Sequence, residues 1–246
     1  RGLGGKSLIG FRERDNPDDR QPDVIVPLSK RGRDDHEVMK MAKLGAAIDV
    51  PDALGPMHLF PDAGRVESVA ARLKSLGWTP SLPTLGLHIS SRQPVQRWSE
   101  AAFAALATQL VEQYGVQLML LWSPGAENDP LHPGDDEKAS RLMARLSGQA
   151  VFPCPTGNIG DLIAALSLTC QMVCSDGGAM HVAAALGKPI LCFFGHSNAV
   201  EWRPWAVPHV LLQPASGRVE DISVDEAAAG FEQLQLSLGD VALRHC

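Results

Sequence analysis

The sequence has little that would tie it to a membrane. None of its apolar stretches reaches the roughly 18 to 20 consecutive residues that a membrane-spanning helix needs. No charged segment followed by an apolar one stands at its amino end, as it does in secretory leaders. The 246 residues are 45% hydrophobic and 20% charged, which suits one large or two modest globular domains. We therefore expect a soluble, folded protein.

An excess of positive charge is also lacking. The formal net charge is -6, and acidic and basic residues are intermixed along the chain. Nonspecific binding to duplex DNA relies on many Lys and Arg side chains that neutralise phosphates. The sequence therefore predicts no nucleic-acid partner, although a local phosphate site is compatible with this balance.

Metal-ligand spacings are absent as well. The five cysteines are odd in number and several lie inside apolar runs, which is typical of buried thiols in a reducing cytoplasm. Cys170 and Cys174 are four residues apart but lack the paired Cys or His residues of a zinc site, so we expect no metal. The cysteines are Cys154, Cys170, Cys174, Cys192 and Cys246.

Two familiar nucleotide-binding motifs are incomplete. No Gly-x-Gly-x-x-Gly follows a predicted strand, which disfavours a dehydrogenase. Gly5-Lys6-Ser7 ends like a phosphate-binding P-loop, but the earlier glycine and the preceding strand of that motif are missing. The chain also begins without Met, and we expect it to lack an amino-terminal segment of its full protein.

From residue 82 onward, short apolar runs alternate with amphipathic helical patterns, which is typical of parallel strands joined by crossover helices. Ser99 and Asn158 are suitable helix caps, and Ser223 with Glu226 forms a capping-box pattern before the last helix. We predict an α/β fold in which residues 81–246 form one Rossmann-like domain with a parallel sheet. The expected strands are 85–89, 116–122, 150–152, 171–174 and 189–194. The expected helices are 99–114, 135–146, 158–166, 180–186 and 223–238, and the inward stripe of the third is Ile159, Leu162, Ile163 and Leu166.

The residues before position 80 have a different pattern. Residues 24–26 are predicted to form a strand, 36–44 a helix ended by Gly45, and 65–76 a helix ended by Gly77. These elements are too few for a complete sheet, so we interpret residues 1–80 as the carboxyl-terminal part of a second, acceptor-binding domain. The segment 78–83, which has two prolines and no periodicity, is the predicted linker.

Polar residues follow the first two strands of the 81–246 domain. In a doubly wound sheet, ligands bind at the carboxyl ends of the strands. Ser90, Ser91 and Gln96 follow the first strand and precede a helix whose exposed backbone N–H groups attract anions. Glu127 follows the second strand, where a carboxylate can accept hydrogen bonds from ribose hydroxyls. An ordinary polar loop would have the same composition.

The strongest motif lies between the strand 171–174 and the helix that starts near Met180. Gly177 and Gly178 remove Cβ atoms where the backbone turns, so that a ligand can approach the N–H groups at the helix start. Such a turn suits a pyrophosphate, and His181, about one turn into the helix, can add a hydrogen-bond donor. A tight turn beside a core histidine is the alternative interpretation.

The run from Asp176 to Pro189, followed by Phe194-Gly195 and by the segment from Glu201 to Trp205, resembles the signature of a known family. This is glycosyltransferase family 9, the ADP-heptose:lipopolysaccharide heptosyltransferases, in which the block reads Asp-Ser/Thr-Gly-x-x-His-x-Ala-Ala-Ala-x-Gly-x-Pro. Gln96-Arg97-Trp98 falls where the family has Lys-Arg/His-Trp, and Gly125-Ala126-Glu127 falls where it has a nucleotide-binding glutamate. The similarity covers nearly the whole chain.

The resemblance implies a GT-B fold, in which two Rossmann-like domains face a cleft and the second holds a nucleotide-sugar donor. It implies an inverting, metal-independent glycosyltransferase that moves a heptose from ADP-heptose to a lipopolysaccharide core or other glycan acceptor without a cofactor. It also implies a place in the cytoplasm or at the cytoplasmic face of the inner membrane, and an aspartate base in a segment outside this chain. The implied donor-binding residues are Ser90, Ser91, Gln96, Glu127, Asp176, Gly177, Gly178, Ala179, Met180 and His181.

Three positions depart from the family pattern. Gln96 replaces the usual lysine, so that a phosphate loses its counter-charge unless Arg92 or Arg97 supplies one. Gly177 replaces a Ser or Thr, and Gly195-His196-Ser197 replaces Gly-x-Thr. Another GT-B enzyme, such as a nucleotide-sugar epimerase, and a noncatalytic nucleotide-binding module remain open as alternatives.

Overall fold

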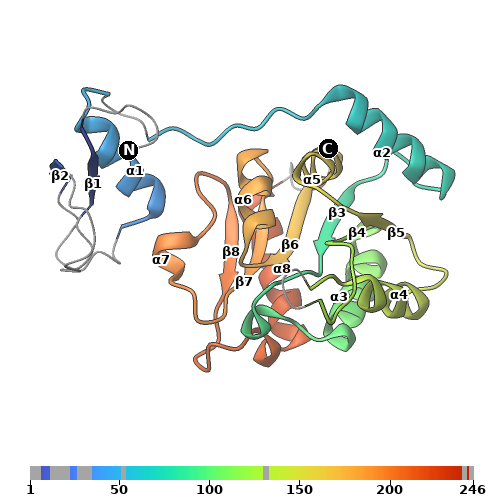
Figure 1. The fold of residues 1–246 in the computed structure, drawn as a ribbon. Helices are drawn as coiled ribbons and strands as arrows, with labels where there is room; N and C mark the ends of the chain where they lie inside the picture. Colours follow the sequence, from blue (N-terminus) through green and yellow to red (C-terminus); the bar gives the residue numbers. More distant parts are fainter. Residues whose placement is uncertain are drawn as a thin grey trace. The chain divides into compact units, whose positions relative to one another are not determined.

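The chain divides into two compact units (Figure 1). In a computed structural model, residues 7–11, 23–26, 35–50, 54–129, 133–239 and 243 are described. Residues 1–55 and 198–203 make up a smaller unit, and residues 56–197 and 204–246 make up a larger one. The larger unit thus begins before the predicted linker at 78–83. The assignment of residues 1–80 to an acceptor-binding domain stays a prediction.

The smaller unit contains two short parallel strands and a helix. Strands β1 (Ile9–Phe11) and β2 (Val24–Val26) pair in parallel, which confirms the strand predicted at 24–26. Helix α1 (Glu37–Ala46) begins after His36, whose Nδ1 accepts a hydrogen bond from the Val38 N–H at 3.1 Å. The predicted end of this helix at Gly45 is wrong, because the helix continues through that residue to Ala46.

A short helix from the second half of the chain belongs to this unit. Helix α7 (Ala199–Trp202) places Glu201 beside the buried Lys40 of α1, and Glu37 lies 3.1 Å from the same ammonium group. The two carboxylates raise the pKa of Lys40 although burial opposes them. A buried ammonium group is tolerated only with such partners, so these contacts hold α7 against α1.

The larger unit is built on six parallel strands in the spatial order β5-β4-β3-β6-β7-β8. Chain order runs outward from β3 in one direction and from β6 in the other, so the order reverses between these two strands. Such a reversal leaves a crevice at the carboxyl ends of the strands, where doubly wound folds bind ligands. The strands are β3 (Thr84–His88), β4 (Gln117–Trp122), β5 (Val151–Pro155), β6 (Gln171–Ser175), β7 (Ile190–Phe193) and β8 (His209–Leu212).

Helices cover both faces of this sheet (Figure 1). Helices α3, α4 and α8 pack together on one face, and α2, α5 and α6 pack on the other. Arg65 of α2 forms an ion pair with Asp161 of α5 at 2.7 Å, so α2 belongs with the sheet. The helices are α2 (Ala63–Ser75), α3 (Glu100–Tyr114), α4 (Asp136–Arg145), α5 (Ile159–Ser167), α6 (Gly178–Ala185) and α8 (Val224–Leu238), with short 3-10 turns at Pro94–Gln96 and Val219–Asp221.

Most predicted elements of this unit are confirmed, together with their caps. Ser99 accepts a hydrogen bond from the Ala102 N–H, and Asn158 accepts one from the Asp161 N–H. Strand β4 is buried along its whole length, as its continuous apolar run requires in a parallel sheet covered on both faces. Strand β8 was not predicted.

Helix α5 is in its predicted place, and Leu166 of its predicted inward stripe is buried, but another residue of that stripe is exposed. Ile159 was predicted to point inward, yet it is 67% exposed. The buried residues are Ala164, Ala165 and Leu166. Small side chains let α5 lie close to its neighbours, and the helix contacts both α2 and α6. The inward stripe predicted from the large apolar residues is therefore wrong at Ile159.

The cysteines follow the prediction in part. Cys154, Cys174 and Cys192 are buried free thiols. Cys170 is disulfide-bonded, so the expectation that it is a thiol is wrong. Cys246 lies outside the described residues, as does the Gly5-Lys6 pair.

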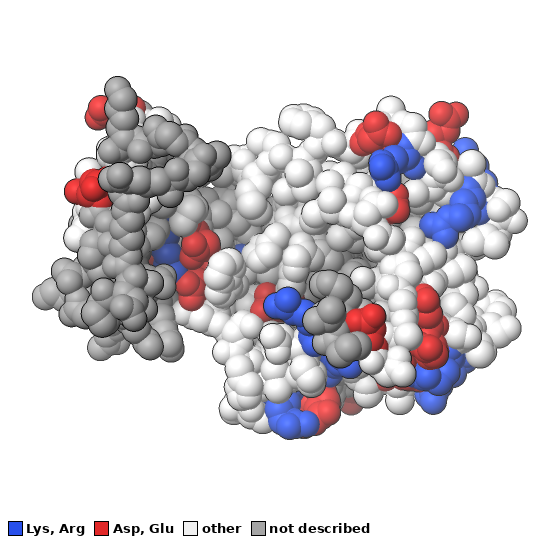
Figure 2. Space-filling model, in the orientation of Figure 1, with Lys and Arg blue, Asp and Glu red and all other residues white. Residues whose placement is uncertain are grey.

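Charges of both signs are interspersed on the visible surface of the larger unit (Figure 2). No helix among the described residues is long and apolar enough to span a bilayer.

The capping box of α8 yields a prediction for stability. Ser223 accepts a hydrogen bond from the Glu226 N–H at 3.2 Å, and the Glu226 carboxylate accepts one from the Ser223 N–H at 2.8 Å. Replacing Ser223→Ala should lower the free energy of unfolding by about 1 kcal/mol, as measured by urea denaturation. Ser237→Ala, on the exposed side of the same helix, should leave it nearly unchanged. Equal effects of the two changes would contradict the role of the cap.

Candidate nucleotide-binding site

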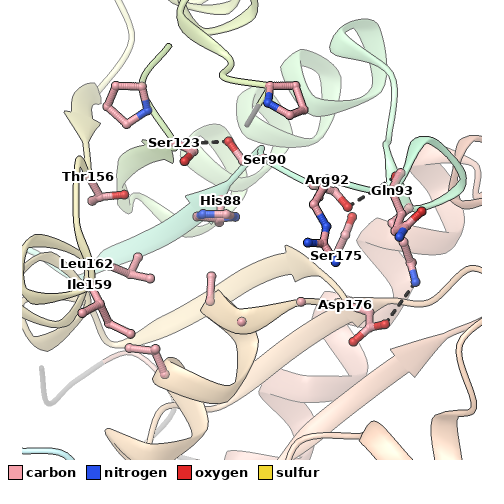
Figure 3. A pocket seen from close by; sticks show the side chains of 18 of the residues that line it. His88, Ser90, Arg92, Gln93, Ser123, Thr156, Ile159, Leu162, Ser175 and Asp176 are labelled. Carbon is pink, nitrogen blue, oxygen red and sulfur yellow. Dashed lines mark hydrogen bonds between the residues drawn. The ribbon is translucent and has the colours of Figure 1, made fainter. Parts of the chain in front are cut away.

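A cavity of about 800 Å³ opens at the carboxyl edge of the sheet, where the strand order reverses. It is enclosed by the loops that follow β3, β4, β5 and β6 (Figure 3). Its volume lies in the range of small-molecule sites. The lining includes His88, Ser90, Ser91, Arg92, Gln93, Gln96, Ser123, Thr156, Asn158, Ile159, Leu162, Ser175, Asp176, Gly177, Gly178, Ala179, Val182 and Ser197.

The loop after β3 forms one wall of the cavity. Ser90 Oγ accepts a hydrogen bond from the Ser123 N–H at 2.9 Å, which ties this loop to the end of β4 (Figure 3). Arg97 Nε donates to the Ser91 carbonyl at 2.9 Å. Both serines line the cavity, and these hydrogen bonds hold the backbone around them in place.

Trp98 anchors the end of the same loop in the core. It is 2% exposed, and its indole N–H donates to the Ile222 carbonyl at 2.8 Å. Its ring packs edge-on against Phe103 and at a tilt against Phe193. The Gln-Arg-Trp motif is therefore a structural support, because its tryptophan fixes where the preceding residues can lie.

The buried amide of Gln96 joins three loops. The residue is 4% exposed, and its Nε2 donates to Asp176 Oδ2 at 3.0 Å and to Ser197 Oγ at 2.7 Å. Its Oε1 accepts the Gly195 N–H at 2.8 Å. The amide thus connects the loop after β3 to the loops after β6 and β7. Its nitrogen donates two hydrogen bonds and its oxygen accepts one, all within the protein.

Gly195 sits where no side chain fits. A Cβ atom on this residue would lie 2.9 Å from the carbonyl oxygens of Val95 and Gly217, which is closer than real Cβ atoms approach. Gln213, just after β8, adds hydrogen bonds from its Nε2 to the carbonyls of Gly195 and Ser197 at 2.7 and 2.8 Å. The Phe194-Gly195 motif therefore reflects close backbone packing beside the cavity.

The turn into α6 forms the opposite wall. The Asp176 N–H donates to the Phe193 carbonyl at 2.8 Å, and Gly177 has φ 157° and ψ -178°, a region that glycine adopts most readily. A Cβ atom added at Gly178 would meet no protein atom within 4 Å. The start of the helix is thus open to the cavity, as predicted from the two glycines.

The loop after β5 supplies an end of the cavity that the sequence did not reveal. Thr156, Ile159 and Leu162 line it (Figure 3), and the Thr156 hydroxyl donates to the Trp122 carbonyl at 3.0 Å. This end combines apolar side chains with a few polar groups. No signal in the sequence indicated this end of the cavity, because the helical pattern assigned the Ile159 side chain to the core.

His88 lies on the cavity wall beneath Ser90 (Figure 3). Burial, together with the nearby positive charge of Lys138, lowers its pKa to about 4, although a hydrogen bond with the Ser90 backbone opposes the shift. The imidazole is therefore neutral at pH 7. It offers the cavity a hydrogen-bonding group without a charge.

The structure brings most of the predicted donor-binding residues together, and leaves three outside the lining. Ser90, Ser91, Gln96, Asp176, Gly177, Gly178 and Ala179 line the cavity. Glu127 pairs instead with Arg141 at 2.6 Å. The Met180 side chain is fully buried, and its N–H donates to the Gly177 carbonyl at 3.1 Å. His181 is partly buried and does not belong to the lining.

Metal-binding groups do not gather in the part of the chain that the structure describes. No three His, Cys, Asp or Glu side chains there lie close enough to hold an ion.

The cavity and its glycine turn define a class of protein. A pocket at the reversal point of a parallel sheet, faced by the open start of a helix, is the arrangement with which α/β domains bind nucleotides. The model of glycosyltransferase family 9 (heptosyltransferase) matches residues 23–221. The chain belongs to this family.

Curated proteins that resemble this chain are named heptosyltransferases. Lipooligosaccharide heptosyltransferase 2 of Haemophilus influenzae is 23% identical over 189 residues, which cover 76% of this chain and 52% of the relative. Lipopolysaccharide heptosyltransferase 1 of Pseudomonas aeruginosa is 31% identical over 119 residues, which cover 48% and 30%. The chain therefore spans about half the length, or less, of these relatives.

Solved structures show a similar fold. The family 9 glycosyltransferase from Veillonella parvula has a TM-score of 0.70 and 19% identity, and the match covers 82% of this chain and 60% of that one. The E. coli heptosyltransferase WaaC with ADP has a TM-score of 0.65 and 15% identity, covering 87% and 60%. These likenesses confirm the predicted GT-B type of fold.

The Gln96 contacts predict a loss of stability when the amide is removed. In Gln96→Ala the buried Gly195 N–H loses its acceptor, so the free energy of unfolding should fall by about 1 to 3 kcal/mol, as measured by chemical denaturation. Gln93→Ala removes an exposed amide from the same loop and should have little effect. If Gln96→Ala were equally harmless, the loops would not depend on this residue.

The depressed pKa of His88 predicts a pH dependence of stability. Its folded-state value of about 4 lies below the ordinary value of 6.5, so between these values the unfolded chain binds the proton more readily. The contribution is fully present above about pH 6.5 and is lost as the pH falls toward 4. The melting temperature of His88→Gln should therefore fall less between pH 7 and pH 4.5 than that of the wild type. Exposed His58→Gln is the control, and identical pH profiles for all three proteins would contradict the prediction.

Proposed function

We propose that the larger unit binds the nucleotide-sugar donor of a glycosyltransferase and that this donor is ADP-heptose. This proposal rests mainly on the turn into α6. Gly178 lines the cavity at the start of that helix, and no protein atom lies near the position of its missing Cβ. Two solved structures of one relative, the E. coli heptosyltransferase WaaC, support the choice of nucleotide, since one is described with ADP and the other with ADP-2-deoxy-2-fluoro heptose.

In this proposal the diphosphate lies against the start of α6. The first N–H groups of a helix lack partners within the helix and carry partial positive charge, which favours an anion. We assign the Gly178 and Ala179 N–H groups to the diphosphate, because the Met180 N–H donates to the Gly177 carbonyl. The Ser90 and Ser91 hydroxyls lie on the opposite wall and are the proposed second set of donors.

The nucleoside is assigned to the end of the cavity formed after β5. Ile159 and Leu162 line that end, and apolar side chains suit the face of a base. Glu127 remains the proposed partner of the ribose hydroxyls. Its present ion pair with Arg141 joins two exposed side chains, and such pairs contribute little stability, so a ligand can replace it at small cost.

The proposed reaction is an inverting transfer of a heptose to a lipopolysaccharide core acceptor at the cytoplasmic face of the inner membrane. The acceptor hydroxyl attacks the anomeric carbon as the bond to the ADP oxygen breaks, so positioning and charge stabilisation carry the catalysis. Negative charge that builds on the leaving diphosphate is met by the helix start. We assign no metal or cofactor to this step, and the proton acceptor is expected to be an aspartate outside this chain.

The donor assignment predicts selective nucleotide binding that depends on Gly178. Isothermal titration calorimetry should show ADP binding more tightly than UDP or GDP. In Gly178→Ala the new methyl group enters the space proposed for the diphosphate, so ADP should bind about tenfold or more weakly. The melting temperature without ligand should not fall, because the methyl group meets no protein atom.

Gly64→Ala is the matched control, since Gly64 lies in the first turn of α2 and its Cβ would make only an ordinary contact with Asp62. It should leave ADP affinity unchanged. Equally weak binding of all three nucleotides would remove the donor assignment. Unchanged ADP affinity in Gly178→Ala would move the diphosphate away from this turn.

A further inference from the structure

A positively charged side chain would complement the helix start at the proposed diphosphate site. A diphosphate leaving group carries more negative charge than the partial charge at one helix start can balance. Asp176, at the edge of the cavity, adds a negative charge of its own. A cationic side chain that faces the cavity would balance more of this charge, and this inference rests on the proposed function.

The position that carries lysine in the family pattern does not supply this charge. Gln96 is neutral, and its amide is committed to Asp176, Ser197 and Gly195 by three hydrogen bonds. It is also buried. Turning the amide toward a phosphate would break the contacts that join three loops, so Gln96 acts as a link between loops.

Three other nearby basic residues are unsuitable as well. Lys138 is 7% exposed, donates to the Ile89 carbonyl at 2.8 Å and lies over the Phe103 ring, outside the cavity lining. Arg97 donates to the Ser91 carbonyl and is also outside the lining. His88 lines the cavity, but its pKa of about 4 leaves it neutral.

Arg92 differs from all of these. It is exposed, it lines the cavity, and Figure 3 shows its side chain reaching toward the side where Ser175 and Asp176 lie. Among the described residues that line the cavity, it is the only Lys or Arg. No carboxylate in the described part of the chain forms an ion pair with it.

We infer that Arg92 supplies the positive charge that binds the donor diphosphate in this chain. A guanidinium group presents a planar set of N–H donors that can hold two phosphate oxygens at once and stays charged at any working pH. Arg92 lies on the wall facing the start of α6, so the diphosphate is gripped from both sides. Gln96 keeps the loop in place, and Arg92 provides the charge.

Calorimetry with ADP and adenosine tests this role. Adenosine lacks the diphosphate, so Arg92→Ala should weaken ADP binding about tenfold or more and change adenosine binding less than twofold. Arg92→Lys should recover part of the ADP affinity, because it restores the charge without the planar donor set. ADP binding by the wild type should also weaken more steeply with added salt than binding by Arg92→Ala.

Arg145→Ala is the matched control, since it removes an exposed arginine from α4 of the same unit, outside the cavity lining. It should leave both affinities unchanged. If the wild type binds ADP and Arg92→Ala binds it equally well, the inference about Arg92 is overturned and the donor site stands. If ADP and adenosine weaken together, Arg92 shapes the loop and the inference is again overturned. A wild type that binds no nucleotide overturns the proposed function itself.

Discussion

One buried side-chain amide connects the loops at the carboxyl edge of the sheet, where the cavity lies. Gln96 hydrogen-bonds groups on the loops after β6 and β7 while its own loop is fixed to the core by Trp98. Beyond the ends of parallel strands the ladder of backbone hydrogen bonds stops within a residue or two, so side-chain contacts of this kind help to set the spacing of the loops. The cavity walls keep their separation because these contacts are satisfied within the protein.

With glutamine at position 96, connecting the loops and balancing the phosphate charge become the roles of two different residues, whereas a single lysine can fill both. A lysine at the end of a loop can be both a tether and a counter-charge, whereas a neutral amide can only be a tether. Gln96 forms three good hydrogen bonds without placing an ammonium group in a buried position, where burial would be costly. The proposed positive charge is then carried by Arg92, which is exposed and takes no part in these three hydrogen bonds.

The sequence predicted most of this fold because local chemistry and burial agree. The caps at Ser99, Asn158 and Ser223 and the buried strand β4 are all confirmed. Strand β8 was missed because four half-buried residues give no strong pattern. The spatial order of the strands depends on long-range packing, and no motif in the chain encodes it directly.

The site was predicted in outline, since strand-end residues of a parallel sheet must share one edge. The sequence could not show that Glu127 pairs with Arg141 or that Gln96 bonds to Gly195, because such partners are distant along the chain. The misplaced Ile159 is the most informative failure. An isoleucine that is 67% exposed at the rim of a cavity gains by covering an apolar surface. In the proposed donor complex, the flat face of the nucleobase covers this side chain.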